Sequence, residues 1–156
     1  YTTKHGKYLY AVVNENPTDK NLSARQTKVD IIDCETLDVV ETIQFNNNVN
    51  EICSVGDDIY VVIANKLHKL DVTTHAVEEV YSFPQDTNIA SVHAKDGHIY
   101  FNARYATVRK DKQMRDVGYI IDFNTTDKSA RQTPLITDAK NTESIVFFPL
   151  SKSDLE

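Results

Sequence analysis

A composite pattern that occurs three times in the same order constrains the fold more than any other feature of the chain. Each occurrence has an aliphatic-aromatic pair ending in tyrosine, then an aspartate with a threonine three residues later, then a short apolar run. The tyrosines are Tyr10, Tyr60 and Tyr100, and the aspartate–threonine pairs are Asp33/Thr36, Asp71/Thr74 and Asp122/Thr125. A period of roughly 40–50 residues is typical of a repeat architecture with one supersecondary unit in each period.

The runs that make up each period are short and rich in β-branched or aromatic residues, as in residues 8–13, 28–32 and 59–63. Asparagine, aspartate and glycine separate them, and no long window has a helical spacing of apolar residues. These features predict an all-β fold. The 156 residues, of which 40% are apolar, suffice for a domain with a core of its own.

The repeated Asp-x-x-Thr element has a local physical explanation. An aspartate at the start of a tight turn accepts hydrogen bonds from backbone N–H groups two or three residues later, and a threonine does the same further along. We therefore interpret Asp33, Asp71 and Asp122 as turn residues between antiparallel strands and not as metal ligands or catalytic groups.

Taken together, these repeats resemble the blades of β-propellers of the YVTN/YncE-like type, over about residues 6–148. The tyrosine position is followed by Ala-Val at Tyr10, Val-Val at Tyr60 and Phe-Asn at Tyr100, so the Tyr-Val core is degenerate. The resemblance implies four-stranded antiparallel meanders arranged from the axis to the rim. A single β-barrel or sandwich is the alternative architecture for a chain of this length.

The resemblance divides residues 1–149 into about three blades. It predicts three strands (b–d) in residues 6–45, a second blade in 48–83, a third in 88–136, and the first strand of a following blade in 142–148, with a polar tail at 150–156. Three blades cannot close a ring. We therefore expect a partial propeller that belongs to a longer chain, or a head-to-tail homodimer in which residues 142–148 complete the first blade of the partner.

Charge and hydropathy exclude several classes of partner. The formal charge of −6 argues against a protein that mainly binds nucleic acid, and the apolar runs are too short for insertion into a membrane. Cys34 and Cys53 are too few for a disulfide scaffold, so we expect small, mostly buried thiols, with a single bridge as the alternative. The acidic, Thr- and Asn-rich composition is compatible with an extracytoplasmic protein, either secreted, periplasmic or on the cell surface.

The sequence contains no nucleophile elbow, zinc-protease helix, phosphate-binding loop or EF-hand loop. His93 and His98 flank a predicted turn, but no cysteine or third histidine supports a zinc site there. We therefore predict no metal, no cofactor and no catalytic residues, and we lean towards a protein that is not an enzyme.

The predicted binding residues come from the connections that share one end of the propeller. Connections between blades are rich in Asn and Asp, whose side chains suit turns and can also bind a carbohydrate or a peptide backbone. The long connection at residues 104–116 carries five basic residues and suits an acidic partner, although a solvated hairpin that merely extends its strands is the simpler interpretation. The candidate ligand-binding residues are Asn48, Glu51, Asp86, Asn88, Ser91, Arg104, Arg109 and Lys112.

Three functions remain open. The first is a non-enzymatic interaction module that binds a protein or glycan partner through the loop face of a propeller. The second is part of a propeller enzyme, such as a lyase, a hydrolase or a quinoprotein-like enzyme, with its active site at the channel mouth. The third is a structural unit of a secreted or surface assembly. The fold alone does not decide among them.

Overall fold

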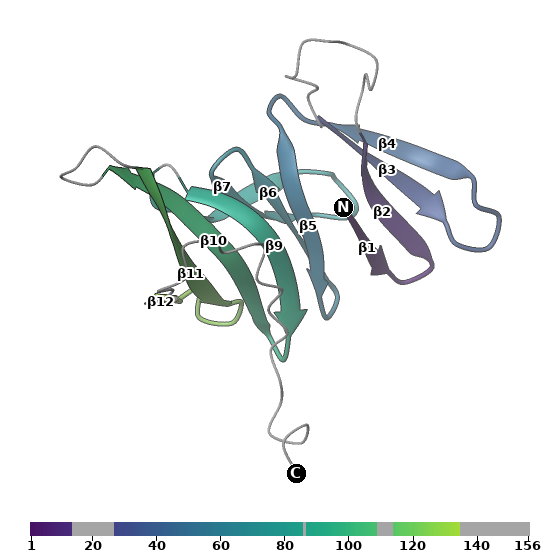
Figure 1. The fold of residues 1–156 in the computed structure, drawn as a ribbon. Helices are drawn as coiled ribbons and strands as arrows, with labels where there is room; N and C mark the ends of the chain where they lie inside the picture. Colours follow the sequence, from purple (N-terminus) through teal and green to yellow (C-terminus); the bar gives the residue numbers. More distant parts are fainter. Residues whose placement is uncertain (14–26, 86, 109–113, 135–156) are drawn as a thin grey trace, which may run out of the picture. The chain divides into compact units, whose positions relative to one another are not determined.

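A computed structural model describes residues 1–13, 27–85, 87–108 and 114–134, which form β-strands and turns without a helix. The strands make three four-stranded antiparallel sheets, each with its strands in chain order (Figure 1). The strands are β1 (Thr2–His5), β2 (Tyr8–Val13), β3 (Lys28–Asp33) and β4 (Val39–Gln44) in the first sheet; β5 (Val49–Val55), β6 (Asp58–Ile63), β7 (Lys66–Leu70) and β8 (Val77–Ser82) in the second; and β9 (Thr87–Lys95), β10 (His98–Val108), β11 (Met114–Asn124) and β12 (Ala130–Pro134) in the third.

Each sheet begins with a two-residue hairpin whose backbone requires a positive φ. Gly6 and Gly56 have φ of 57° and 58°, and in the third hairpin both Asp96 and Gly97 are positive, at 52° and 80°. Turns of this kind match the twist of the strands that they join, and glycine or aspartate tolerates them best. The hairpins therefore set the same register at the start of every sheet.

The chain divides into two compact units, Tyr1–Phe83 and Pro84–Glu156. In the first unit, one face of β1–β4 packs against β5–β8 through a shared core that includes Tyr10, Ile31, Ile59 and Val61. Strand β3 alternates buried and half-buried residues, as expected for a sheet with one covered face, whereas β6 is buried continuously over residues 59–63. The first strands of the two sheets, β1 and β5, lie side by side (Figure 1). A hydrogen bond that Thr3 Oγ1 donates to Ser54 Oγ at 2.9 Å joins them.

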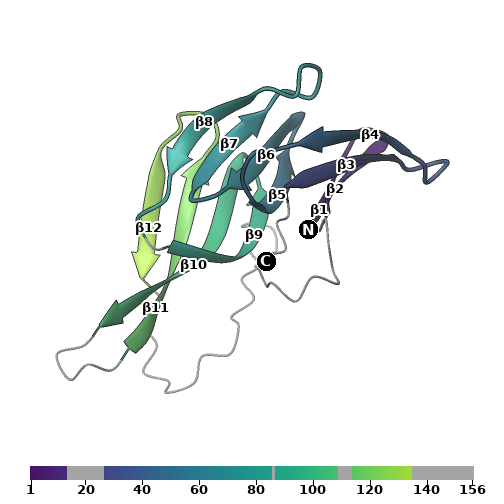
Figure 2. The same cartoon turned by 90° about the horizontal axis from the view of Figure 1, so that it is seen from above.

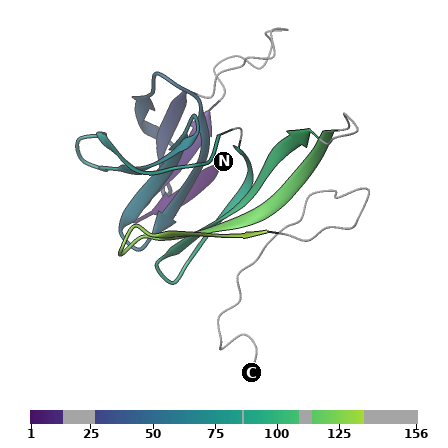
Figure 3. The same cartoon turned by 90° about the vertical axis from the view of Figure 1, so that its left-hand side faces the viewer.

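In the second unit, the pairing of β10 with β11 continues out to Val108 and Met114 (Figure 2). The two strands project beyond β9 and β12, and the β11–β12 turn lies at the opposite end of the sheet (Figure 3). Ile99, Phe101, Ile121 and Phe123 share one face and are fully buried. The alternate residues on the other face are mostly polar.

The structure confirms the all-β, four-stranded antiparallel architecture, and the described residues form three separate sheets and not one closed barrel. One strand count was wrong: the first sheet has four strands and not three, because β1 pairs with β2 over Thr2–Ala11 to His5–Tyr8. β1 therefore occupies the edge that was assigned to residues 142–148 of a partner. The sequence Thr-Thr-Lys-His has no apolar alternation, which explains why it was missed. Residues 142–148 and 150–156 lie outside the described residues.

The repeat alignment is confirmed for the tyrosines and corrected for one turn. Tyr10, Tyr60 and Tyr100 all lie in the second strand of their sheet, two residues from the end that adjoins the hairpin. In the third sheet, however, the turn begins at Asn124, whose Oδ1 accepts a hydrogen bond from the Thr126 N–H. Asp122 instead lies within β11, and Thr125 Oγ1 donates to the Gly97 carbonyl, so the Asp122/Thr125 match is not the turn element.

Both cysteines are free thiols, so the single bridge is absent. Cys53 is buried, as expected, but Cys34 is exposed because it lies in the turn that follows β3. Burial raises the pKa of the Cys53 thiol to about 12, which keeps it protonated and unreactive.

Candidate functional site

Two connections of the first unit meet at one end of its second sheet, where the propeller resemblance placed the binding face. The Ala64 N–H, in the β6–β7 turn, donates to the Asn48 carbonyl at 3.0 Å, and Asn50 Nδ2 donates to the Ala64 carbonyl at 2.8 Å. The two connections are thereby fixed to each other. They line a hollow of about 360 Å³ whose walls are Asn46, Asn47, Asn48, Asn50 and Ala64.

The asparagine side chains of this end are available to a ligand. Asn46, Asn47 and Asn48 are exposed, and their side-chain amides form no hydrogen bond with the residues that the structure describes. Each amide offers a donor and an acceptor, the same pair that a peptide backbone presents. We call Asn46, Asn47, Asn48, Asn50 and Ala64 the asparagine end.

Glu51 lies next to the asparagine end on β5, the first strand of the second sheet, but it is buried where the asparagines are exposed. Its side chain is only 5% exposed, and its Oε1 has no hydrogen-bond partner in the described structure. Burial raises the pKa of the Glu51 carboxyl to about 7, because the charged form is costly where water is excluded. A carboxyl with this pKa is partly protonated at neutral pH.

Ser91 occupies the equivalent position in the second unit. Glu51 of β5 pairs with Val62, and Ser91 of β9 pairs with Asn102. Each of the two residues lies beside a one-residue bulge in its own strand. The Ser91 hydroxyl is also buried without a hydrogen-bond partner in the described part of the chain. Glu51 is the third residue of β5, whereas Ser91 lies at the middle of β9, and the role of both residues in binding stays a prediction.

The remaining predicted binding residues belong to the second unit. Asn88 and Arg104 pair across β9 and β10, with Asn88 exposed and Arg104 half-buried. Asp86, Arg109 and Lys112 lie outside the described residues. The structure extends β10 and β11 into much of residues 104–116, which agrees with the simpler interpretation of that connection as a hairpin extension.

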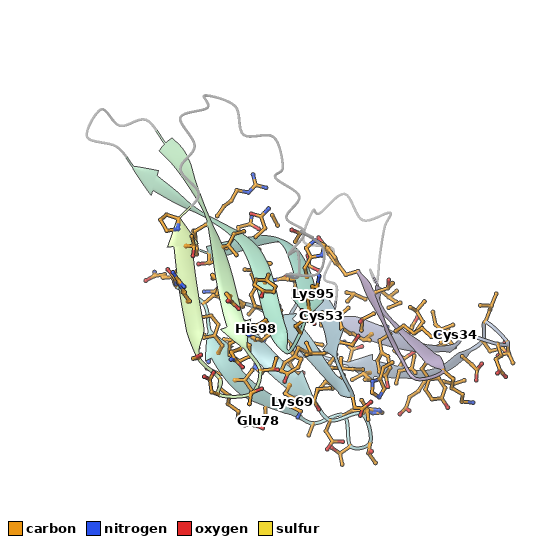
Figure 4. The ribbon with its side chains drawn as sticks, turned by 90° about the horizontal axis from the view of Figure 1, so that it is seen from below. Cys34, Cys53, Lys69, Glu78, Lys95 and His98 are labelled. Carbon is orange, nitrogen blue, oxygen red and sulfur yellow. The ribbon has the colours of Figure 1, made fainter. Side chains whose placement is uncertain are left out.

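Sequence reasoning missed a larger hollow of about 500 Å³ at the opposite end of the second sheet. Its walls include the acidic residues Asp57, Asp58, Asp71 and Glu78, the cation Lys69, and the apolar Leu70, Val72 and Val77. Lys69 Nζ lies 2.8 Å from Asp58 Oδ1, and Figure 4 shows Lys69 and Glu78 close together. The four carboxylates of the walls outnumber this single lysine. The excess of acidic over basic residues in 57–58 and 69–78 could have indicated this hollow, but of these residues only Asp71 was interpreted, as a turn residue.

Titratable groups also gather on the polar face of the third sheet. His98 Nδ1 lies 2.6 Å from Asp122 Oδ1, and the His98 ring stacks on Tyr100 at a centroid distance of 5.9 Å (Figure 4 labels His98). His93 is on the neighbouring strand β9, directly opposite Tyr100. Among residues 1–13, 27–85, 87–108 and 114–134, no three potential ligands are arranged to hold a metal ion. Nor do these residues form a helix with the length and hydropathy that a membrane crossing requires.

Comparison with known proteins identifies the fold. No protein-family model and no curated protein matches the chain. A chain in the solved complex of S. cerevisiae Dbp5 with Nup159, Gle1, IP6 and ADP is similar at a TM-score of 0.53 and 13% identity, over 85% of this chain and 32% of that chain. The Neurospora crassa Pan2 WD40 domain is similar at a TM-score of 0.51 and 14% identity, over 85% of this chain and 38% of that one.

The chain thus spans about a third of the length of the structures that it resembles. At 13–14% identity the likeness shows the fold alone. The YVTN-type assignment of the blades has no matching family model and stays a prediction. The described residues form blades of the propeller type.

Proposed function

We propose that the chain is a non-enzymatic interaction module, a segment of a β-propeller that binds a protein partner through the asparagine end. The observation that supports this proposal is the combination of exposed side-chain amides, which form no hydrogen bond with the described residues, and a backbone fixed by the Ala64–Asn48 and Asn50–Ala64 hydrogen bonds. Because the backbone that carries these amides is fixed, the protein loses little backbone entropy when a peptide binds them. The WD40 identity of one structural neighbour agrees with an interaction role.

The acidic hollow supports a second candidate surface of a different specificity. The Asp71 carboxylate accepts hydrogen bonds from the Thr73 and Thr74 N–H groups, both at 2.8 Å, and these bonds hold its pKa below the usual value. The carboxylate therefore stays charged at neutral pH. With Val72 and Val77 partly exposed beside it, this hollow suits a basic side chain that is flanked by apolar ones.

A selection from a random peptide library displayed on phage distinguishes the two surfaces. We expect enriched peptides whose affinity falls at least about tenfold in the triple variant Asn46→Ala, Asn47→Ala, Asn48→Ala, as several hydrogen bonds are lost. The matched control is the double variant Asp57→Ala, Glu78→Ala at the opposite end, which should bind as the wild type does.

Each other outcome contradicts the first proposal. Basic peptides that lose affinity only in the Asp57→Ala, Glu78→Ala variant would assign binding to the acidic hollow. A glycan array that gives saturable binding, with no enriched peptide, would show that the partner is a carbohydrate. No binding to either library would contradict an interaction site at the asparagine end.

A further inference from the structure

Strand β4 forms one edge of the first sheet, and no described strand pairs with its outer side (Figure 1). The Phe45 N–H donates to the Thr27 carbonyl at 2.7 Å, so the backbone of Phe45 faces β3. Because the backbone groups of an antiparallel strand point alternately to its two sides, those of Ile43 also face β3, whereas those of Thr42 and Gln44 point away from it. The outer side of β4 therefore presents backbone donors and acceptors that no described strand uses.

The side chains of β4 give this edge less protection than the corresponding edges of the other two sheets have. Proteins prevent further pairing at an edge strand by means of charged side chains or proline. Strand β8 carries two adjacent glutamates, Glu78 and Glu79, and strand β12 carries Arg131 and Pro134, whose nitrogen has no hydrogen to donate. Strand β4 contains one charged residue, Glu41, and no proline.

Glu41 is directed towards the second sheet, and the exposed valines of β4 are left at the edge. The Oε1 atom of Glu41 lies 3.4 Å from Nδ1 of His75, in the turn between β7 and β8. Val39 and Val40, the first two residues of β4, are 54% and 53% exposed. Unused backbone groups next to exposed β-branched side chains are what an extended peptide needs in order to add a strand to a sheet.

The charges around this edge determine which kind of peptide it attracts. Residues 28–44 contain five acidic residues and one basic residue. Asp38 directly precedes β4 and is exposed, and Asp30 Oδ1 accepts a hydrogen bond from the Thr42 hydroxyl at 2.6 Å. Carboxylates therefore lie at the start of β4 and beside its middle, and their charge is complementary to that of a basic segment.

We propose that the edge of β4 binds an extended basic segment of a partner protein, which joins the first sheet as an added strand. Val39 and Thr42 lie on the same face of the sheet, since their partners on β3, Ile32 and Asp30, are two residues apart. The segment therefore carries an aliphatic residue beside Val39 and a lysine or arginine beside Thr42, at alternate positions of its own sequence. The proposal does not rest on the asparagine end.

The described edge strands of a second copy do not have this composition. Antiparallel pairing of two β4 strands brings carboxylates of one copy close to those of the other, and β8 presents two glutamates. Like charges on paired strands destabilise the pairing. Strand β12 contains a proline. The occupant is therefore a segment of a different protein.

A synthetic peptide tests the proposal: a labelled chain of nine residues, Thr-Val-Thr-Lys-Thr-Val-Thr-Lys-Thr. We expect saturable binding in fluorescence anisotropy, with a Kd of about 100 μM or lower. Glutamate in place of both lysines should weaken binding at least about tenfold. Two further peptides carry backbone N-methyl groups on alternate residues, either on the threonines or on the valines and lysines. Because one side of an added strand faces β4, only one of these two peptides should lose binding.

Variants of the protein show where the peptide binds. The double variant Val39→Lys, Val40→Lys adds positive charge at exposed positions of the edge and should weaken binding at least about tenfold. The matched control, Gln132→Lys with Thr133→Lys, places two lysines on the exposed strand β12 and should bind as the wild type does. Asp38→Asn removes one exposed carboxylate, so it should lower the affinity about threefold at low salt and less at high salt. Circular dichroism verifies that each variant is folded.

Each other result overturns the proposal. No saturable binding up to about 1 mM peptide, or equal losses for the two N-methylated peptides, would exclude an added strand. Binding that is lost in the triple variant of the asparagine end but kept in Val39→Lys, Val40→Lys would assign it to the asparagine end. Loss only in the double variant of the acidic hollow would assign it there. A chain that dimerises in light scattering, and that Val39→Lys, Val40→Lys returns to a monomer, would assign the edge to a second copy.

Discussion

The first and third sheets share a register but differ in the chemistry of the face that carries Tyr10 or Tyr100. In the first sheet this face presents Val29 and Ile31, both nearly inaccessible, and it packs against β5–β8. In the third sheet the position of Ile31 holds Asp122, and its partner His98 is one-third exposed. The comparison teaches that the backbone of a repeat specifies where a side chain points, whereas the residue at that position decides whether the face can be buried.

The largest predicted effect on stability comes from exchanging Ile31 and Asp122, which occupy the same position in the first and third sheets. Ile31→Asp places a carboxylate in a closed apolar core, so we expect the first unit to lose about 3 kcal/mol or more of its free energy of unfolding. The reciprocal Asp122→Ile removes only the contact with His98, in which both side chains are about one-third exposed, and should change the stability of the third sheet by about 1 kcal/mol or less.

Native-state hydrogen exchange measures the two variants within their own units. The amides of β2 and β3 report on Ile31→Asp, and those of β10 and β11 report on Asp122→Ile. Similar losses of protection in both sheets would show that the third sheet also buries its Tyr100 face, and the contrast between the sheets would be wrong.

A second prediction concerns strands β5 and β9, where Glu51 and Ser91 occupy equivalent positions. The pKa of Glu51 is raised to about 7, whereas an unfolded chain has an ordinary glutamate pKa near 4.5. The folded state therefore holds a proton that the unfolded state has released, and the stability of the first unit should fall by roughly 2 kcal/mol as the pH rises from about 4.5 to 7.

Glu51→Gln removes this titration. We expect the stability of the variant to vary less with pH over that interval and to exceed that of the wild type at pH 8. Glu35→Gln, in the exposed turn that follows β3, is the matched control, and the pH profiles of the two variants should differ. A Glu51→Gln profile that is parallel to the wild-type profile would contradict a raised pKa.

How far the sequence predicted these features depends on whether local chemistry or tertiary pairing determines each one. The alternation in Lys28–Asp33 and the apolar run in residues 59–63 are local, and the structure confirms both as strands. Strand β1 was missed because Thr2–His5 is polar throughout, and only its pairing with β2 makes it a strand.

The third turn shows why a motif match can be correct in type and wrong in position. Asp122/Thr125 fits the repeated Asp-x-x-Thr spacing, but the register with β10 places the turn two residues later, at Asn124. Asn124 and Asp127 each accept a hydrogen bond from the N–H two residues later, as Asp71 and Thr74 do, so these two hydrogen bonds are kept with different residue types. Of the predicted binding residues, Asn48 lies at an exposed connection, as expected from the sequence. The acidic hollow was missed because only the pairing of the strands brings Asp57 and Glu78 together.

The smallest predicted effect tests whether the aspartate and asparagine turns are equivalent. Asp71→Ala leaves the Thr73 and Thr74 N–H groups without their acceptor, so we expect the Tm to fall by a few degrees. Asp71→Asn keeps an acceptor oxygen, as Asn124 does in the third sheet, and should recover most of the loss at pH 7. Because the pKa of Asp71 is lowered, the wild-type advantage over Asp71→Asn is present above about pH 4 and disappears as the pH falls through the folded-state pKa. Thermal unfolding of the three proteins at pH 7 and pH 3 measures both effects. If Asp71→Asn were as unstable as Asp71→Ala at pH 7, the turn would be stabilised by the negative charge and not by the acceptor geometry that Asp71 shares with Asn124.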